Sequence, residues 1–185
     1  MDDPAHPATS DVPPHRNVPV PTPGRVLLHT VPAAAVLTVG LPLLTYWEPD
    51  GAGDARGGWI PFAPALLMGL ALVVQHRARA RRPRLDQHAD QRVLRRWIGH
   101  TAGSGRVPED PSARTAAGAL ACGQLETAVL TWGAVGGIIG IWFVRPESWW
   151  AVTAALLMLI AVVPVLRARR SWRYLQALDA HERTH

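Results

Sequence analysis

The sequence predicts an all-α integral membrane protein with four transmembrane helices and a cytoplasmic helical hairpin between spans 2 and 3. Three observations predict this fold. The 185-residue chain is 48% hydrophobic, and its apolar residues are concentrated in four uncharged runs. Tryptophans border the two short loops between these runs, whereas most arginines lie in the other segments. A soluble protein of this size has too little polar surface to cover four apolar helices, so insertion into a membrane is expected.

The N-terminal segment, residues 1–24, contains seven prolines and little apolar periodicity. Such a composition buries too little apolar surface to fold, so we predict a disordered, Pro-rich cytoplasmic arm. Its opening residues Met1, Asp2 and Asp3 lack the basic stretch of a secretory signal, and no cleaved signal peptide is expected.

A first transmembrane hairpin is expected over residues 25–76. Its first span, 26–47, contains no Asp, Glu or Arg. As a helix it would be roughly 33 Å long, enough to cross a hydrocarbon core of about 30 Å. The second span, 59–75, is also uncharged but lies near the lower length limit.

The segment 77–124 is predicted to form a basic helical hairpin. Within residues 85–98, Ala89, Val93 and Trp97 share one helical line, and two further apolar residues lie beside it. This pattern is typical of an amphipathic helix. The two neighbouring residues are Leu94 and Ile98.

A second helix of this hairpin is expected after the breaker-rich turn GHTAGSGRVPEDP. Asp110 provides an N-cap oxygen, and Pro111 occupies the first helical position, where its missing N–H has no cost. The helix is expected to continue without a break into the third span.

The second transmembrane hairpin, residues 125–166, contains spans 127–144 and 149–166, followed by a cytoplasmic helical tail over 167–185. The third span contains two overlapping G-x-x-x-G pairs, which flatten one helix face and allow another backbone to approach. We predict a helix-packing surface there, with a partner helix of the same chain preferred over a second copy. Its residues are Gly133, Gly136, Gly137 and Gly140.

The arginines predict the orientation. Two lie in the N-terminal flank, ten in residues 76–126 and five after residue 166, whereas the loops 48–58 and 145–148 contain one each. The positive-inside rule therefore predicts a multi-pass cell-membrane protein with N- and C-termini cytoplasmic. Five of the eight tryptophans lie beside the two arginine-poor loops, as expected of a membrane interface.

A dense basic run follows the second span and could contact anionic lipid headgroups. The alternative is that it acts only as a topology determinant that stops translocation. Neither aromatic interleaving nor a recognition fold accompanies it, so no nucleic acid partner is predicted. The run contains Arg77, Arg79, Arg81, Arg82 and Arg84.

Composition limits the chemistry. All nineteen basic residues are Arg, which excludes a catalytic lysine, and the single Cys122 excludes an internal disulfide and a multi-cysteine metal site. No Asp, Glu or Arg lies in the middle of any span, which disfavours a coupled pump. Thr38, Thr131 and Thr153 are expected to donate to carbonyls of their own helices.

Two motifs could carry chemistry, but neither has the required context. His181, Glu182 and His185 satisfy H-E-x-x-H, a zinc-binding pattern, but they lie in the tail, outside any span and without a third ligand. The loop Asp50–Arg56 is similar to the D-G-x-x-A-R opening of CDP-alcohol phosphotransferases, but it is one residue too long and lacks the rest of that motif. We therefore predict no catalytic, cofactor-binding or metal site.

The hairpin pattern Gly105–Arg106–x–Pro108–x–Asp110–Pro111–x–x–Arg114–x–x–Ala117, with the all-Arg composition and four short spans, resembles uncharacterised small membrane proteins of the high-GC actinobacterial type. This resemblance implies a membrane location and an all-helical fold. The first functional hypothesis is an interaction or accessory subunit of a membrane assembly, as a homo-oligomer or with another membrane protein. The alternatives are an oligomeric channel or transporter subunit, and a membrane-bound metal-dependent enzyme.

Overall fold

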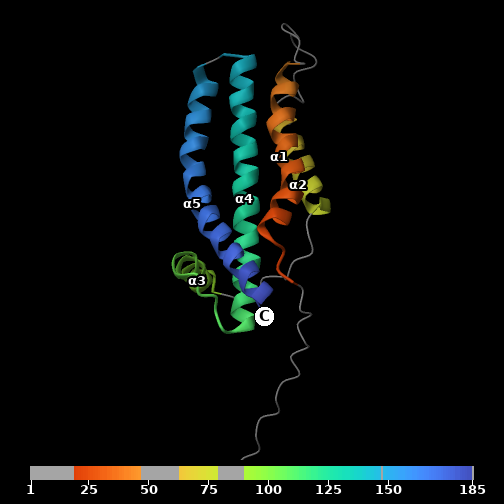
Figure 1. Cartoon of the computed structure of the whole chain (residues 1–185). Helices are drawn as coiled ribbons and strands as arrows, with labels where there is room; N and C mark the ends of the chain where they lie inside the picture. Colours follow the sequence, from red (N-terminus) through yellow and green to blue (C-terminus); the bar gives the residue numbers. More distant parts are fainter. Residues whose placement is uncertain (1–18, 47–62, 79–89, 147, 185) are drawn as a thin grey trace, which may run out of the picture.

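The computed structural model describes residues 19–46, 63–78, 90–146 and 148–184 (Figure 1). This part of the chain forms five helices and no strand, which confirms the all-α class. The helices are α1 (Pro23–Tyr46), α2 (Ala63–Ala78), α3 (Gln91–Ser104), α4 (Pro111–Val144) and α5 (Ser148–Thr184).

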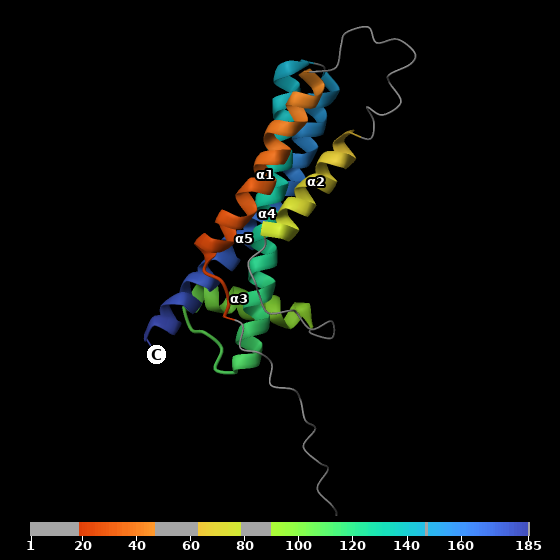
Figure 2. The same ribbon diagram turned by 90° about the vertical axis from the view of Figure 1, so that its right-hand side faces the viewer.

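The three longest helices lie side by side. In Figure 1 α4 lies between α1 and α5, and α2 packs on α1. Figure 2 shows that α3 crosses the bundle near the start of α4. Helices α1 and α4 run in the same direction, whereas α2 and α5 run in the opposite one (Figure 1).

Helices α1, α4 and α5 are long and apolar enough to cross a membrane, with mean hydropathies of 1.8, 1.8 and 2.3 over their apolar windows. Only 22%, 28% and 11% of these windows are buried inside the molecule. Long apolar helices that remain mostly uncovered by protein indicate a membrane protein. Helix α2 has 16 residues and is shorter, about 24 Å. Three helices are therefore candidate spans by length and composition, and the fourth span stays a prediction.

Helices α4 and α5 extend well beyond their apolar segments, as the sequence predicts. Asp110 caps α4: its carboxylate accepts hydrogen bonds from the backbone N–H of Ser112 at 2.9 Å and of Ala113 at 3.3 Å, and Pro111 follows directly. Helix α5 continues through Pro164 to Thr184. The start of α4 and the end of α5 are therefore polar helical segments that lie outside the apolar part of the bundle.

Helix α3 is longer than the sequence predicts. The breaker-rich turn is predicted to begin at Gly99, but the helix continues to Ser104. Thr101 is buried and its hydroxyl donates to the carbonyl of Arg106 at 2.9 Å, which stabilises the last turn. The helix ends at Gly105, whose φ of 70° is easily adopted only by glycine.

The apolar face of α3 is narrower than expected. Leu94 and Ile98 are buried together with Thr101, whereas Val93 and Trp97 remain 43% and 40% exposed. The buried pair belongs to a core cluster that joins the ends of α1, α3, α4 and α5 around Tyr174, Leu175 and Leu178, among others. One helix can turn only one side towards this core, so the neighbouring apolar line stays outside.

Candidate functional site

The glycine face of α4 packs against α1. A Cβ added at Gly137 would lie 2.5 Å from the carbonyl oxygen of Leu37 and 2.6 Å from Cδ1 of Leu41. A Cβ at Gly133 would lie 2.9 Å from both Cα and the carbonyl oxygen of Ala34. All four distances are well below the 3.4 Å at which ordinary contacts begin, so only glycine allows the two backbones to lie this close.

The flanking glycines accommodate side chains of α1. At Gly136 a Cβ would lie 3.2 Å from Cγ2 of Thr38, and at Gly140 it would lie 3.0 Å from Cγ of Pro42. The Thr38 hydroxyl is also 3.1 Å from the carbonyl oxygen of Gly133 and in position to donate to it across the interface. All four glycines are therefore used inside the chain, and a homo-oligomer would need another surface.

A buried polar contact joins α2 to α4. The side-chain amide Nε2 of Gln75 donates to Oε2 of Glu126 at 3.2 Å, and the two residues are only 9% and 6% exposed. Burial of a carboxylate requires such partners. The sequence analysis did not predict this contact, because Gln75 ends the second span and Glu126 directly precedes the third, so each was interpreted only as the limit of a span. The contact could have been predicted from the topology, which places the end of the second span and the start of the third on the same side of the membrane.

Two further hydrogen bonds hold the extension of α5 on α4. The Ser171 hydroxyl donates to Oε1 of Gln124 at 2.7 Å, and the Tyr174 hydroxyl donates to the carbonyl of Arg114 at 3.1 Å. Ser171 and Tyr174 are fully buried. Burial raises the pKa of Tyr174 to about 12, with the nearby Arg114 charge acting in the opposite direction. The extension of α5 is thus attached to α4 by specific contacts.

The outer side of α3 presents an apolar and basic surface. Val93 and Trp97 lie four residues apart, and Arg92 and Arg96 precede each of them and are exposed. We call these four residues the α3 surface. Arg and Trp are the side chains most enriched at protein-interaction hot spots.

Several predicted sites lie wholly or partly outside the described residues. Arg77 is exposed at the end of α2, but Arg79, Arg81, Arg82 and Arg84 are outside, as is the loop Asp50–Arg56. In the tail, His181 is half-buried and Glu182 exposed at the end of α5, and His185 is outside. Among the described residues no group of three or more His, Cys, Asp or Glu could hold a metal ion.

Comparison with known proteins adds no assignment. No protein-family model, curated protein or solved structure matches the chain.

Proposed function

We propose that this protein is a multi-pass cell-membrane protein that acts as a non-enzymatic accessory subunit, using the α3 surface to bind another protein in the cytoplasm. The main support for this proposal is the packing of α3. Leu94 and Ile98 anchor the helix in the core, whereas Val93 and Trp97 remain exposed beside two arginines. A helix fixed in this way presents a preorganised surface, which lowers the entropic cost of binding.

The chain direction supports four spans. Helices α1 and α4 run the same way, so the chain has to return across the membrane between Tyr46 and Pro111 if both are spans. Helix α2 lies between them in sequence, is apolar and runs in the returning direction. The Gln75–Glu126 contact aligns its far end with the start of the apolar part of α4.

The arginine distribution supports the orientation. The end of the bundle that carries α3 also carries the extensions of α4 and α5, with Arg92, Arg106, Arg114, Arg167 and Arg173 among their basic residues. The positive-inside rule assigns this end to the cytoplasm. The partner chemistry follows from the same charges: a protein segment with carboxylates beside an apolar side chain would complement the α3 surface.

A photo-reactive amino acid at position 97, introduced into the full chain in cells, tests the proposal. Position 95 is the matched control, because Arg95 is exposed on the same helix and lies about 160° away around its axis. We expect one protein adduct from position 97 and none from position 95. The same protein should co-purify with the unmodified chain and be lost with Trp97→Ser but not Arg95→Ser.

Adducts with lipid alone, or the same protein adducts from both positions, would overturn the proposal. Lipid adducts would show that Trp97 lies on the membrane surface rather than in a protein interface.

An oligomeric channel is the alternative function, and the exposed faces argue against it. Side chains exposed along the apolar half of α5 are large and apolar, as expected for contact with lipid; they include Val152, Leu156, Leu159, Ile160 and Val163. Thr131 and Thr153 donate to carbonyls of their own helices at 2.8 and 2.9 Å, as predicted. Ion flux through liposomes containing the purified protein would favour the channel instead.

A further inference from the structure

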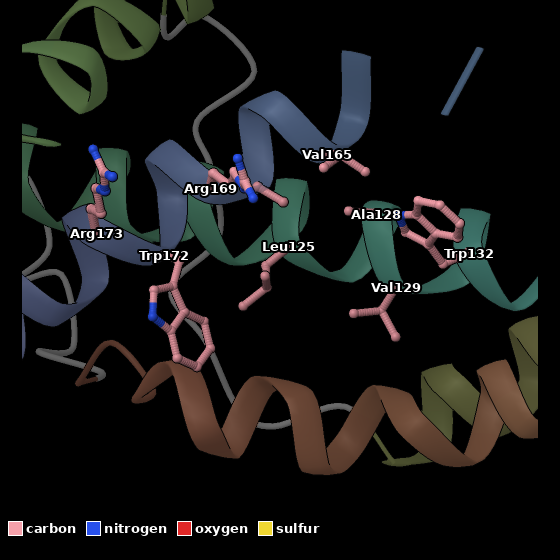
Figure 3. Close-up of a pocket in the computed structure, with 9 residues that line it drawn as sticks. Leu125, Ala128, Val129, Trp132, Val165, Arg169, Trp172 and Arg173 are labelled. Atoms are coloured by element: carbon pink, nitrogen blue, oxygen red, sulfur yellow. The ribbon is translucent and has the colours of Figure 1, made fainter. Parts of the chain in front are cut away.

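A groove runs between α4 and α5 at the place where their apolar segments meet the basic extension (Figure 3). Its volume is about 670 Å³. The α4 side is formed by residues on one helical face, one turn apart, and is entirely uncharged: Leu125, Ala128, Val129 and Trp132.

The α5 side of the groove changes character along its length. Val165 lies at the same end as Trp132, whereas Arg169, Trp172 and Arg173 lie towards the other end (Figure 3). Along α5 this change takes place over about 12 Å. The groove is thus apolar at the membrane end and basic at the other end.

The two arginines of the groove are available to a ligand. Arg169 and Arg173 are exposed and four residues apart, so they project from the same face about one turn apart. Within the described part of the chain neither guanidinium forms an ion pair, and no acidic residue lines the groove. Two positive charges with no acidic partner among the described residues, beside an apolar floor, suit a ligand with an anionic head and an apolar tail.

We propose that this groove binds one phospholipid with an anionic headgroup. Arg169 and Arg173 donate to its phosphate oxygens, in charge-assisted hydrogen bonds. Val129 and Trp132 contact the first part of an acyl chain, and Trp172 lies between the two arginines at the level of the headgroup. Basic pockets between spans on the cytoplasmic side suit such headgroups.

The location of the groove favours lipid over a soluble anion. Arg169 follows the apolar segment of α5 by three residues, and Ala128 lies at the start of the apolar segment of α4, so both are at headgroup depth. The inference rests on the proposed insertion in the membrane for this depth. A free phosphate ion would use the two arginines but would leave the apolar floor uncovered.

Native mass spectrometry of the full chain in mild detergent tests the site, with phosphatidylglycerol and phosphatidylcholine of identical acyl chains as probes. The variant R169Q/R173Q removes the basic end of the groove. The matched control R167Q/R170Q removes the same charge from exposed positions on the same helix that do not line the groove. We expect one phosphatidylglycerol adduct, weakened about 30-fold in R169Q/R173Q and little changed in the control.

The apolar floor is tested separately. Val129→Trp fills the groove without a change of charge, and it should weaken the same adduct while circular dichroism stays unchanged. Inorganic phosphate should not displace the lipid at equal concentration.

Three results would overturn the site: equal binding of the two lipids, equal losses in the two arginine variants, or displacement by inorganic phosphate. The first would leave the groove as a surface for protein packing, the second would indicate general charge attraction, and the third would indicate an anion site. Because binding is measured in detergent, these results are independent of the crosslinking at position 97, and either proposal can fail alone.

Discussion

Among the four glycines that face α1, a Cβ would come nearest to α1 at Gly137, and Gly137→Ala should separate the two helices. The new Cβ would lie 2.5 Å from the carbonyl oxygen of Leu37 and 2.6 Å from the Leu41 side chain, where ordinary contacts begin at 3.4 Å. One of these neighbours is helical backbone, which cannot rotate away. Relief therefore needs a relative shift of nearly 1 Å between the helices, estimated from ordinary contact distances.

The energetic cost follows from this overlap. Overpacking of a well-packed interface costs about 1–3 kcal/mol, and a backbone neighbour places this site near the upper value. Replacement of a helical glycine by alanine returns about 1 kcal/mol of helix propensity. The expected net loss of stability is about 2 kcal/mol. Gly69→Ala is the matched control, because a Cβ there meets nothing within 4 Å and only the favourable contribution applies.

The protein supplies its own reporter for this measurement. Cys122 is the only cysteine and is fully buried, so a thiol-reactive fluorophore labels it only after unfolding. In a thermal ramp in detergent, Gly137→Ala should label at a lower temperature than the unchanged protein, and Gly69→Ala at the same or a higher temperature. A Gly137→Ala protein that is as stable as the Gly69→Ala control would refute the close helix contact.

Three further predictions concern the end of the bundle that carries α3. Burial raises the pKa of Tyr174 from 10.0 to about 12, so the stability gained from its neutral hydroxyl is complete below pH 10 and is lost as the pH rises towards 12. The variant Tyr46→Phe leaves Tyr174 as the single tyrosine, and its absorbance at 295 nm should rise with a midpoint near pH 12. A midpoint near pH 10 would contradict the buried site. The hydrogen bonds that Asp110 accepts from Ser112 lower the pKa of its carboxyl from the ordinary value of 3.8, so the N-cap of α4 is retained above pH 3.8 and is lost as the pH falls through the lowered pKa. Asp110→Ala should accelerate amide hydrogen exchange in the first turn of α4. Unchanged exchange would show that the cap does not stabilise this turn. Gly105→Ala should destabilise α3 by about 1 kcal/mol because of its left-handed backbone, whereas Gly103→Ala should not, and equal melting temperatures of the two variants would refute the strain argument.

Local patterns in the sequence were sufficient for the helices themselves. Asp110 and Pro111 predict the start of α4, and the apolar runs predict α1 and the apolar segments of α4 and α5. Both predictions are possible from sequence because capping and hydropathy depend on residues close together in the chain. The predicted end of α3 was wrong, because the helix is extended by tertiary contacts that breaker residues do not reveal. These are the hydrogen bond from Thr101 to the Arg106 carbonyl and the packing of α3 on the buried core.

Local sequence patterns are enough to identify the apolar helices, the cap of α4 and the glycine face on it. The packing of that face on α1, the contact of Gln75 with Glu126 and the exposure of Val93 and Trp97 become known only from the fold. Hydropathy defines the length of a helix, but its rotation about its own axis depends on contacts between residues far apart in the chain. Thr38 and Gly133, 95 residues apart, are one such contact.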